Sequence, residues 1–242
     1  MTKYRCLQTW APLRKEASST SEMVSSLLFG ETCTVLDTHN DWKHVVCDFD
    51  GYTGWIPESY LNGITEAEVW DIAVHGHRVS LVEGDQRVHI SIGSTIPNNP
   101  EIVIDGQVWT LEDNSAHYPL TPWQVAHSLL HVPYLWGGRS DCGIDCSGLS
   151  QICFKVFGIQ IARDSADQAK QGKDVAFGDH LPNDLAFFSN AQGKITHVGI
   201  IAPEGIVHAS GKVRLDMLTA EGILHSQSKT ITHQLSCIKR LI

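Results

Sequence analysis

The pattern of apolar and polar positions changes near residue 119. Before it, short alternating runs such as residues 34–36, 44–47 and 102–104 are separated by glycine-containing turns. Short alternating runs bounded by turn residues are typical of β-strands with one buried face. We therefore expect the first half of the chain to form small all-β barrels.

The second half has helical spacing first and strand-like runs afterwards. Apolar residues recur at helical spacing over residues 122–130 and 147–157, on either side of a Gly137-Gly138 loop. Three apolar runs bounded by turn residues follow and are expected to be strands, at residues 185–188, 197–201 and 206–209. The fold class predicted for this half is α+β, with helices first and a sheet after them.

Composition excludes several partners. The chain of 242 residues carries 18 Lys and Arg against 27 Asp and Glu, and it has no basic cluster of the kind that binds a phosphate backbone. No run approaches the roughly 18 apolar residues of a membrane span. Residues 1–10 lack the apolar core of a secretory signal, so we expect a cytoplasmic protein that binds neither nucleic acid nor membrane. The pattern does not indicate an oligomeric state.

A cysteine stands where a glycine-containing loop gives way to the second helical run. Cys146 lies within the sequence Asp145-Cys146-Ser147-Gly148. A free thiol has a pKa of about 8.5 and is mostly protonated at neutral pH, so a nucleophilic cysteine needs help. The N–H groups of a helix N-terminus and a nearby protonated imidazole would both favour the thiolate. The chemistry therefore requires a histidine partner.

Two of the 13 histidines stand apart from the others. His197 opens one predicted strand, and His208 lies in the next, eleven positions on. If these strands are adjacent and antiparallel, His197 can face Cys146 while His208 bonds the far nitrogen of the His197 ring and fixes its tautomer. We expect the three side chains to form a nucleophile, a base and an orienting group.

Neither a metal nor a cofactor is expected. The seven cysteines lack the dense spacing of a disulfide scaffold and are interpreted as free thiols. Cys142 with Cys146 and His127 with His131 have ligand-like spacing, but neither pair belongs to a complete set of nitrogen and sulfur ligands. Cys142 has no role that the pattern explains.

The first half resembles bacterial SH3 (SH3b) domains. The specific part of the match is the glycine-flanked turn Gly51-Tyr52-Thr53-Gly54-Trp55. The resemblance implies an SH3b domain over residues 1–63. A weaker resemblance of the same kind implies a second SH3b-like domain over residues 64–118.

The second half resembles the NlpC/P60 family of cysteine peptidases. Five motifs occur in order, at residues 134–138, 145–148, 163–165, 181–188 and 197–200. The resemblance implies a papain-like catalytic domain over residues 119–242, with Cys146 as nucleophile, His197 as base and His208 as the third polar residue. No cofactor is needed.

A branch of this family combines SH3b domains with cytosolic recycling of murein peptides and cuts the γ-D-glutamyl–diamino acid bond. By that resemblance the partner is a murein-derived peptide, L-Ala-γ-D-Glu-diamino acid, with a free N-terminal amine. Glu22, Tyr52 and Asp145 match positions that face the amine. The remaining substrate-binding positions implied by the match are Trp136, Ser147 and Ser165. The pattern does not distinguish diaminopimelate from Lys in the substrate.

Two alternatives remain open. The chain could be an SH3b-based wall-binding protein with secondary or no peptidase activity, although Cys146 and both histidines are present. It could also be a Cys-dependent amidase or transferase, because a Cys–His pair does not dictate the acceptor of the acyl group.

Overall fold

The chain forms two compact units. The computed structural model describes residues 3–64, 70–76, 79–104, 106–115 and 119–242. Unit 1 comprises residues 1–118 and 136–141, and unit 2 comprises residues 119–135 and 142–242. The predicted third domain, 119–242, therefore differs from unit 2 by the segment 136–141, which groups with unit 1. Residue 118, the predicted end of the second domain, lies outside the described residues.

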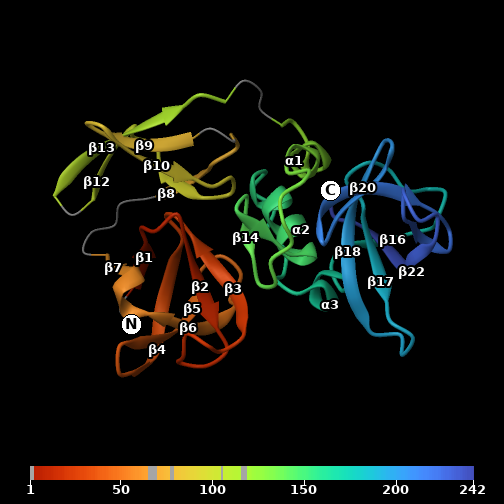
Figure 1. Ribbon diagram of the computed structural model, residues 1–242, viewed down its shortest axis with the longest axis horizontal. Coiled ribbons are helices and arrows are strands. Elements are labelled where there is room, and N and C mark those ends of the chain that lie inside the picture. Colours follow the sequence, from red (N-terminus) through yellow and green to blue (C-terminus); the bar gives the residue numbers. More distant parts are fainter. Residues whose placement is uncertain (1–2, 65–69, 77–78, 105, 116–118) are drawn as a thin grey trace. The chain divides into compact units, whose positions relative to one another are not determined.

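A seven-stranded antiparallel sheet forms the first part of unit 1, with the strand order β3-β2-β6-β5-β4-β1-β7 (Figure 1). Its elements are β1 (Lys3–Cys6), β2 (Trp10–Arg14), β3 (Met23–Leu28), β4 (Thr32–His39), β5 (Trp42–Cys47), β6 (Thr53–Pro57), the 3-10 helix η1 (Glu58–Tyr60) and β7 (Leu61–Gly63). Alternating side chains such as Leu13, Val45 and Ile56 fill its core, as the apolar pattern predicted.

The second part of unit 1 is also all β. It contains β8 (Trp70–Ala73), β9 (Val79–Glu83), β10 (Gln86–Ile90), β11 (Thr95–Pro97), β12 (Glu101–Ile104) and β13 (Gln107–Asp113). These strands form a four-stranded sheet, β10-β9-β13-β12, and a two-stranded sheet, β11-β8. The structure confirms the all-β prediction for this segment, and its SH3b-like character stays a prediction.

Phe29 joins the two parts of unit 1. It is fully buried in the second hydrophobic core, and its carbonyl accepts a hydrogen bond from the N–H of Thr95. The next residue, Gly30, has φ +79°, and a Cβ atom there would lie 1.7 Å from the Thr95 carbonyl oxygen. Only glycine permits this close approach of the backbones.

The segment 136–141 is held in unit 1 by a buried ion pair. Arg139 begins β14 (Arg139–Ser140). Its guanidinium donates to both carboxylate oxygens of Glu31, at 2.9 and 3.0 Å, and to the carbonyl of Ser26 at 2.7 Å. The side chains of Arg139 and Glu31 are 1% and 2% exposed. A charge pair so far from water must be well bonded, because each charge left alone would be strongly destabilising.

Unit 2 packs three helices against an antiparallel sheet (Figure 1). The elements are α1 (Pro122–Ser128), β15 (Gly143–Ile144), α2 (Cys146–Lys155), α3 (Ser165–Gln168), β16 (Lys173–Val175), β17 (Leu185–Ser189), β18 (Ile195–Ala202), β19 (Gly205–Ser210), β20 (Lys212–Leu218), β21 (Gly222–Leu224) and β22 (Ile231–Arg240). The strand order is β16-β22-β17-β18-β19-β20-β21, and β21 also pairs with β22. The row of strands from β22 to β21 therefore closes on itself.

Helix α2 is central to unit 2. All ten of its residues are buried, and it packs against β18, β19 and the helices α1 and α3. The predicted helices and the three predicted strands of this half are all present, and the α+β prediction is confirmed. The strands after residue 210 were not predicted, and they include the long strand β22.

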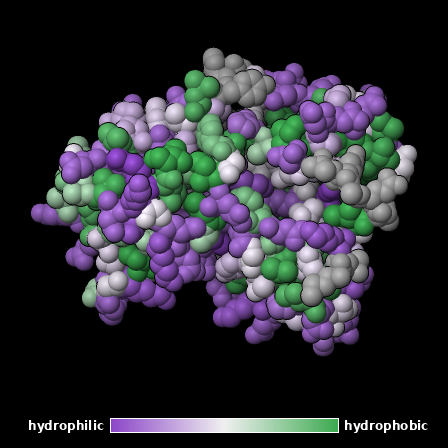
Figure 2. All heavy atoms as spheres, turned by 180° about the vertical axis from the view of Figure 1, so that it is seen from behind, coloured by the Kyte–Doolittle hydropathy of each residue, from purple (hydrophilic) through white to green (hydrophobic). Residues whose placement is uncertain are grey.

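The face of the molecule drawn in Figure 2 carries many polar residues. Hydrophilic residues cover much of the face in Figure 2, with hydrophobic areas scattered among them. The most exposed large apolar side chains of the described residues include Leu120 and Val103. Within the described residues, none of the helices has the length and apolar character that a membrane crossing requires.

Candidate active site

Cys146 is the first residue of helix α2. Asp145 precedes it in an extended conformation, and its carboxylate accepts a hydrogen bond from the N–H of Gly148 at 2.7 Å. Asp is among the preferred residues at this position because its side chain satisfies an N–H that the helix leaves free. The thiol of Cys146 is also approached by the backbone N–H groups of Ser147 and Val198. The sulfur therefore lies beside the strand that carries His197.

Burial decides the protonation state of this thiol. The pKa of Cys146 is raised to about 12, mainly because the thiol is removed from water and secondly because of the neighbouring Asp145 carboxylate. The N–H groups of Val198 and Ser147 and the guanidinium of Arg163 act in the opposite direction. In the free protein the Cys146 side chain is therefore a thiol, and the predicted role as nucleophile requires a base that removes its proton.

His197 and His208 come together as the sequence predicted. They lie on the antiparallel neighbours β18 and β19, with Gly199 opposite His208. The Nε2 atom of His197 lies 2.9 Å from Nδ1 of His208. Burial lowers the pKa of His197 well below its ordinary value, and the adjacent His208 and His233 lower it further. His197 is therefore neutral and able to accept a proton.

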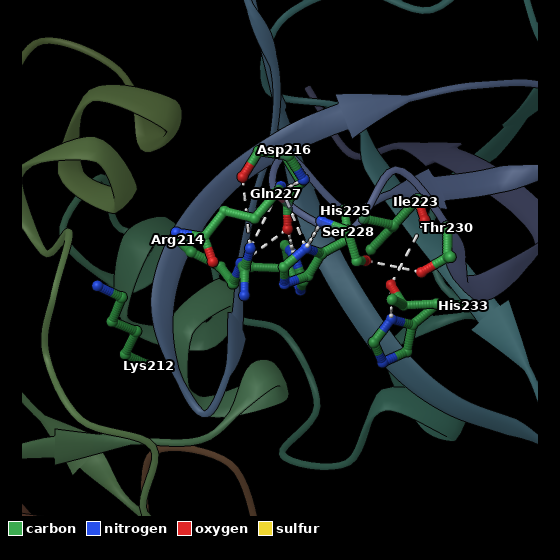
Figure 3. A network of polar contacts seen from close by, with 12 residues as sticks. Lys212, Arg214, Asp216, Ile223, His225, Gln227, Ser228, Thr230 and His233 are labelled. Carbon is green, nitrogen blue, oxygen red and sulfur yellow. Dashed lines mark hydrogen bonds and ion pairs between the residues drawn. The ribbon is translucent and has the colours of Figure 1, made fainter.

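Asp216 and His233 complete this cluster and were not predicted. The carboxylate of Asp216, on β20, lies 3.1 Å from Nε2 of His208. The ring of His233, on β22, stacks on the ring of His197 with centroids 4.1 Å apart and an interplanar angle of 23°. Both residues come from strands that the sequence pattern missed (Figure 3).

A second polar network lies at the start of α2. Arg163 donates to both carboxylate oxygens of Asp145, at 2.6 and 3.1 Å, and to the Ser147 hydroxyl at 2.9 Å. The side chains of Arg163 and Asp145 are 2% and 7% exposed. The negative charge of Asp145 is therefore already paired inside unit 2. Ser165 is half-buried at the first position of α3, which packs against α2 and β18.

The remaining predicted substrate residues lie in unit 1. The carboxylate of Glu22 accepts a hydrogen bond from the indole N–H of Trp136 at 3.0 Å. Glu22 and Tyr52 line one pocket of about 580 Å³, together with Lys15 and His44. Lys15 Nζ lies 3.6 Å from the Glu22 carboxylate, so the pocket contains a cation that the sequence interpretation did not include. The predicted residues are thus distributed between the two units.

No cluster of metal ligands accompanies these residues. Over the part of the chain that the structure describes, no group of three or more His, Cys, Asp or Glu side chains is placed to hold a metal ion. All seven cysteines are free thiols.

Two family models match the chain. The model of the NlpC/P60 family matches residues 131–234, and the model of the bacterial dipeptidyl-peptidase SH3 domain matches residues 13–61. The second model ends before the second part of unit 1. The two matches cover the parts of the chain for which the sequence motifs were most specific.

Relatives and solved structures agree with these models. A γ-D-glutamyl-L-lysine dipeptidyl-peptidase of Bacillus subtilis is 32% identical over 75% of this chain and 70% of its own length. An enzyme of the same name from Bacillus cereus is 25% identical over 79% of this chain and 68% of its own length. The crystal structure of an NlpC/P60 family protein from Bacillus cereus has the same fold, with a TM-score of 0.82, 19% identity and 99% of each chain covered.

A helix-start cysteine beside two neighbouring strands, each of which carries one member of a buried histidine pair, is the arrangement of a cysteine peptidase. With the comparisons above, the chain belongs to the NlpC/P60 family.

The resting thiol can be tested by alkylation. Because burial raises the pKa of Cys146 to about 12 and only the thiolate reacts, the rate of its modification by iodoacetamide should rise about tenfold per pH unit between about pH 6 and 9. Tandem mass spectrometry would locate the label, with the exposed Cys142 as the reference thiol. A Cys146 rate that is independent of pH in this range would mean a thiolate–imidazolium pair and would contradict the prediction.

Proposed function

We propose that this protein hydrolyses the bond between the γ-carboxyl of D-Glu and a diamino acid in murein-derived peptides with a free N-terminal L-Ala. The observation that carries the proposal is the set Cys146, His197 and His208 in a chain that also matches the bacterial dipeptidyl-peptidase SH3 model. The name γ-D-glutamyl-L-lysine dipeptidyl-peptidase, given to both Bacillus relatives, supports the choice of bond.

The reaction is acyl transfer to sulfur and then to water. His197 takes the proton of the Cys146 thiol as the sulfur attacks the γ-carbonyl carbon, and backbone N–H groups near the start of α2 stabilise the oxyanion. His197 then gives its proton to the leaving amine, which leaves a thioester on Cys146. Water, activated by the same imidazole, hydrolyses the thioester and restores the thiol. The neutral state of His197 supports its role as the first base.

Selection of a free amine is assigned to the pocket of Glu22 and Tyr52 in unit 1. A carboxylate and a phenol favour an ammonium group and disfavour an acylated one. The side chain of Glu22 is 46% exposed in the free protein, where an ion pair contributes only about 0–1 kcal/mol. The contribution grows when a bound peptide excludes water. Asp145 was also expected to face the amine, but its pairing with Arg163 favours a structural role for it.

The test compares L-Ala-γ-D-Glu-L-Lys with the same peptide acetylated on its N-terminus. We expect release of L-Ala-D-Glu from the free peptide, measured by mass spectrometry, and a kcat/KM at least about tenfold lower for the acetylated one, equivalent to about 1.4 kcal/mol. Glu22→Gln should reduce this preference, whereas Glu16→Gln, an exposed charge outside the pocket, should not. The diaminopimelate peptide, assayed in parallel, shows which diamino acid is preferred.

The outcomes separate the alternatives. Equal hydrolysis of the free and acetylated peptides would contradict the amine pocket and leave the peptidase in place. Hydrolysis of neither peptide would direct attention to an amidase or transferase, or to a wall-binding protein. The cytoplasmic location and the role in murein-peptide recycling stay predictions, and cell fractionation together with analysis of accumulated peptides in a deletion strain would test them.

A further inference from the structure

We propose that Asp216 is a positioning residue of the active site, which fixes the tautomers of both histidines so that His197 presents a bare Nδ1 to Cys146. The proposal rests on the Cys146–His197 chemistry of the proposed function, but it does not depend on which peptide is cut.

Asp216 is a fully buried carboxylate with several partners. Its side chain is 0% exposed, and its Oδ2 atom lies 3.1 Å from His208 Nε2 and 2.8 Å from Arg214 Nε. Its Oδ1 atom accepts from the N–H of Ser226 at 2.7 Å and from Arg214 Nη2 at 3.2 Å. Figure 3 shows Arg214 and Asp216 next to the turn that carries His225 and Ser228. Burial alone would raise the pKa of Asp216, but these hydrogen bonds lower it well below its usual range, so the group is ionised.

An ionised carboxylate can only accept hydrogen bonds, and this determines the tautomer of His208. The contact between Asp216 Oδ2 and His208 Nε2 therefore requires a proton on Nε2. Burial lowers the pKa of His208, and the hydrogen bond to Asp216 and the charge of that carboxylate only partly offset this, so the ring is neutral. A neutral imidazole carries one N–H, which leaves Nδ1 of His208 as an acceptor.

The tautomer of His197 follows from that of His208. The Nδ1 atom of His208 accepts, so Nε2 of His197, 2.9 Å away, must be the donor. His197 is also neutral, and its Nδ1 atom is then unprotonated. This is the ring nitrogen that is not bonded to His208, and in the proposed mechanism it takes the proton of the thiol. When Nδ1 takes the proton, the Nε2–H bond to His208 remains and the Asp216 charge stabilises the resulting cation.

Other groups around the histidines do not supply this constraint. Arg214 is a donor only and approaches Asp216 rather than an imidazole nitrogen. His233 contacts the face of the His197 ring, and His225 accepts from the backbone N–H groups of Gln227 and Ser228. Among the residues that the structure describes, Asp216 is the carboxylate that is hydrogen-bonded to this histidine pair.

The first experiment is nitrogen NMR of the imidazole rings in the full-length wild-type protein at neutral pH. We expect His208 and His197 both to carry their proton on Nε2, with a bare Nδ1. A proton on Nδ1 of His208 would overturn the proposal. This measurement uses no substrate, so its failure is distinct from failure of the proposed function.

The second experiment compares Asp216→Asn with Arg214→Gln. Asparagine can donate its amide N–H to His208 Nε2 and so permit the opposite tautomers, and we expect kcat to fall about 100-fold or more with an altered NMR pattern. Arg214→Gln removes a partner of Asp216 that does not contact the histidines, and it should keep the wild-type tautomers. Its fall in kcat should be at least tenfold smaller than the fall in Asp216→Asn. Equal losses in the two folded variants, or loss in Asp216→Asn with unchanged tautomers, would mean a purely structural role.

Discussion

Replacing Cys146 with alanine is expected to lower kcat for the tripeptide by roughly 10⁴- to 10⁶-fold, because the reaction then lacks the sulfur that forms the acyl intermediate. His197→Ala should cause a loss of similar size, since the thiol stays protonated without its base. The double variant should be no slower than either single one, because the two groups act as a unit. Steady-state kinetics with detection of free L-Ala-D-Glu would measure these losses.

Cys142→Ala is the matched control for these variants. It also removes a thiol, four positions before Cys146, but from an exposed site outside the histidine cluster. We expect this variant to keep wild-type kcat. Activity of Cys146→Ala within about tenfold of wild type would show that another group is the nucleophile.

The buried pair of Arg139 and Glu31 should give the largest change in stability. Arg139→Met leaves the Glu31 carboxylate, which is 2% exposed, without its cation and should destabilise unit 1 by about 3–5 kcal/mol. Glu31→Gln removes the carboxylate charge instead and leaves the guanidinium of Arg139 without its counter-ion. It should destabilise unit 1 by a similar amount. Denaturant unfolding of the full chain, followed by the fluorescence of unit 1 tryptophans, would measure the change.

A double variant provides the control for this pair. Arg139→Met with Glu31→Leu removes both charges and replaces them with apolar groups of similar size. Much of the stability should return, because no unpaired charge remains in the core. A double variant that is less stable than both single variants would contradict this account. Lys170→Met, at an exposed ion pair with Asp167, should change stability by less than about 1 kcal/mol.

The sequence predicted those helices and strands that are specified by the spacing of apolar residues over a short stretch of the chain. The alternating runs of unit 1, the helix at Cys146 and the strands of His197 and His208 depend on spacing within a few residues. The contact between His197 and His208 was also predictable, because consecutive strands joined by a short turn pair with each other.

The residues that were missed depend on pairing between distant segments. Asp216 lies on a strand where burial reverses the usual pattern, since Asp216 is buried and Met217 is exposed. A charged residue at an inward position could have signalled a partner, but only if the strand itself had been recognised. His233 meets His197 because β22 pairs with β17, although β22 is the last strand of the chain. No local pattern specifies that neighbour.

Asp145 illustrates a different difficulty. The resemblance assigned it to the substrate amine, and its position before a helix equally predicts a cap for the helix. The structure has the cap, with Gly148, and adds Arg163 from 18 positions further on. Both observations concern the free protein, and the identity of the amine-binding groups stays a prediction.

The location of Arg139 has a consequence for how such a chain can be divided and recombined. Glu31 obtains its counter-ion from a residue 108 positions later, after the chain has already contributed α1 to unit 2. A fragment cut at residue 118 would keep the buried carboxylate and lose its guanidinium. The N-terminal unit is therefore not an exchangeable module. If it is transplanted into another peptidase, the loop of the host must supply a matching arginine. The segments that carry Glu31 and Arg139 are therefore expected to vary together among relatives.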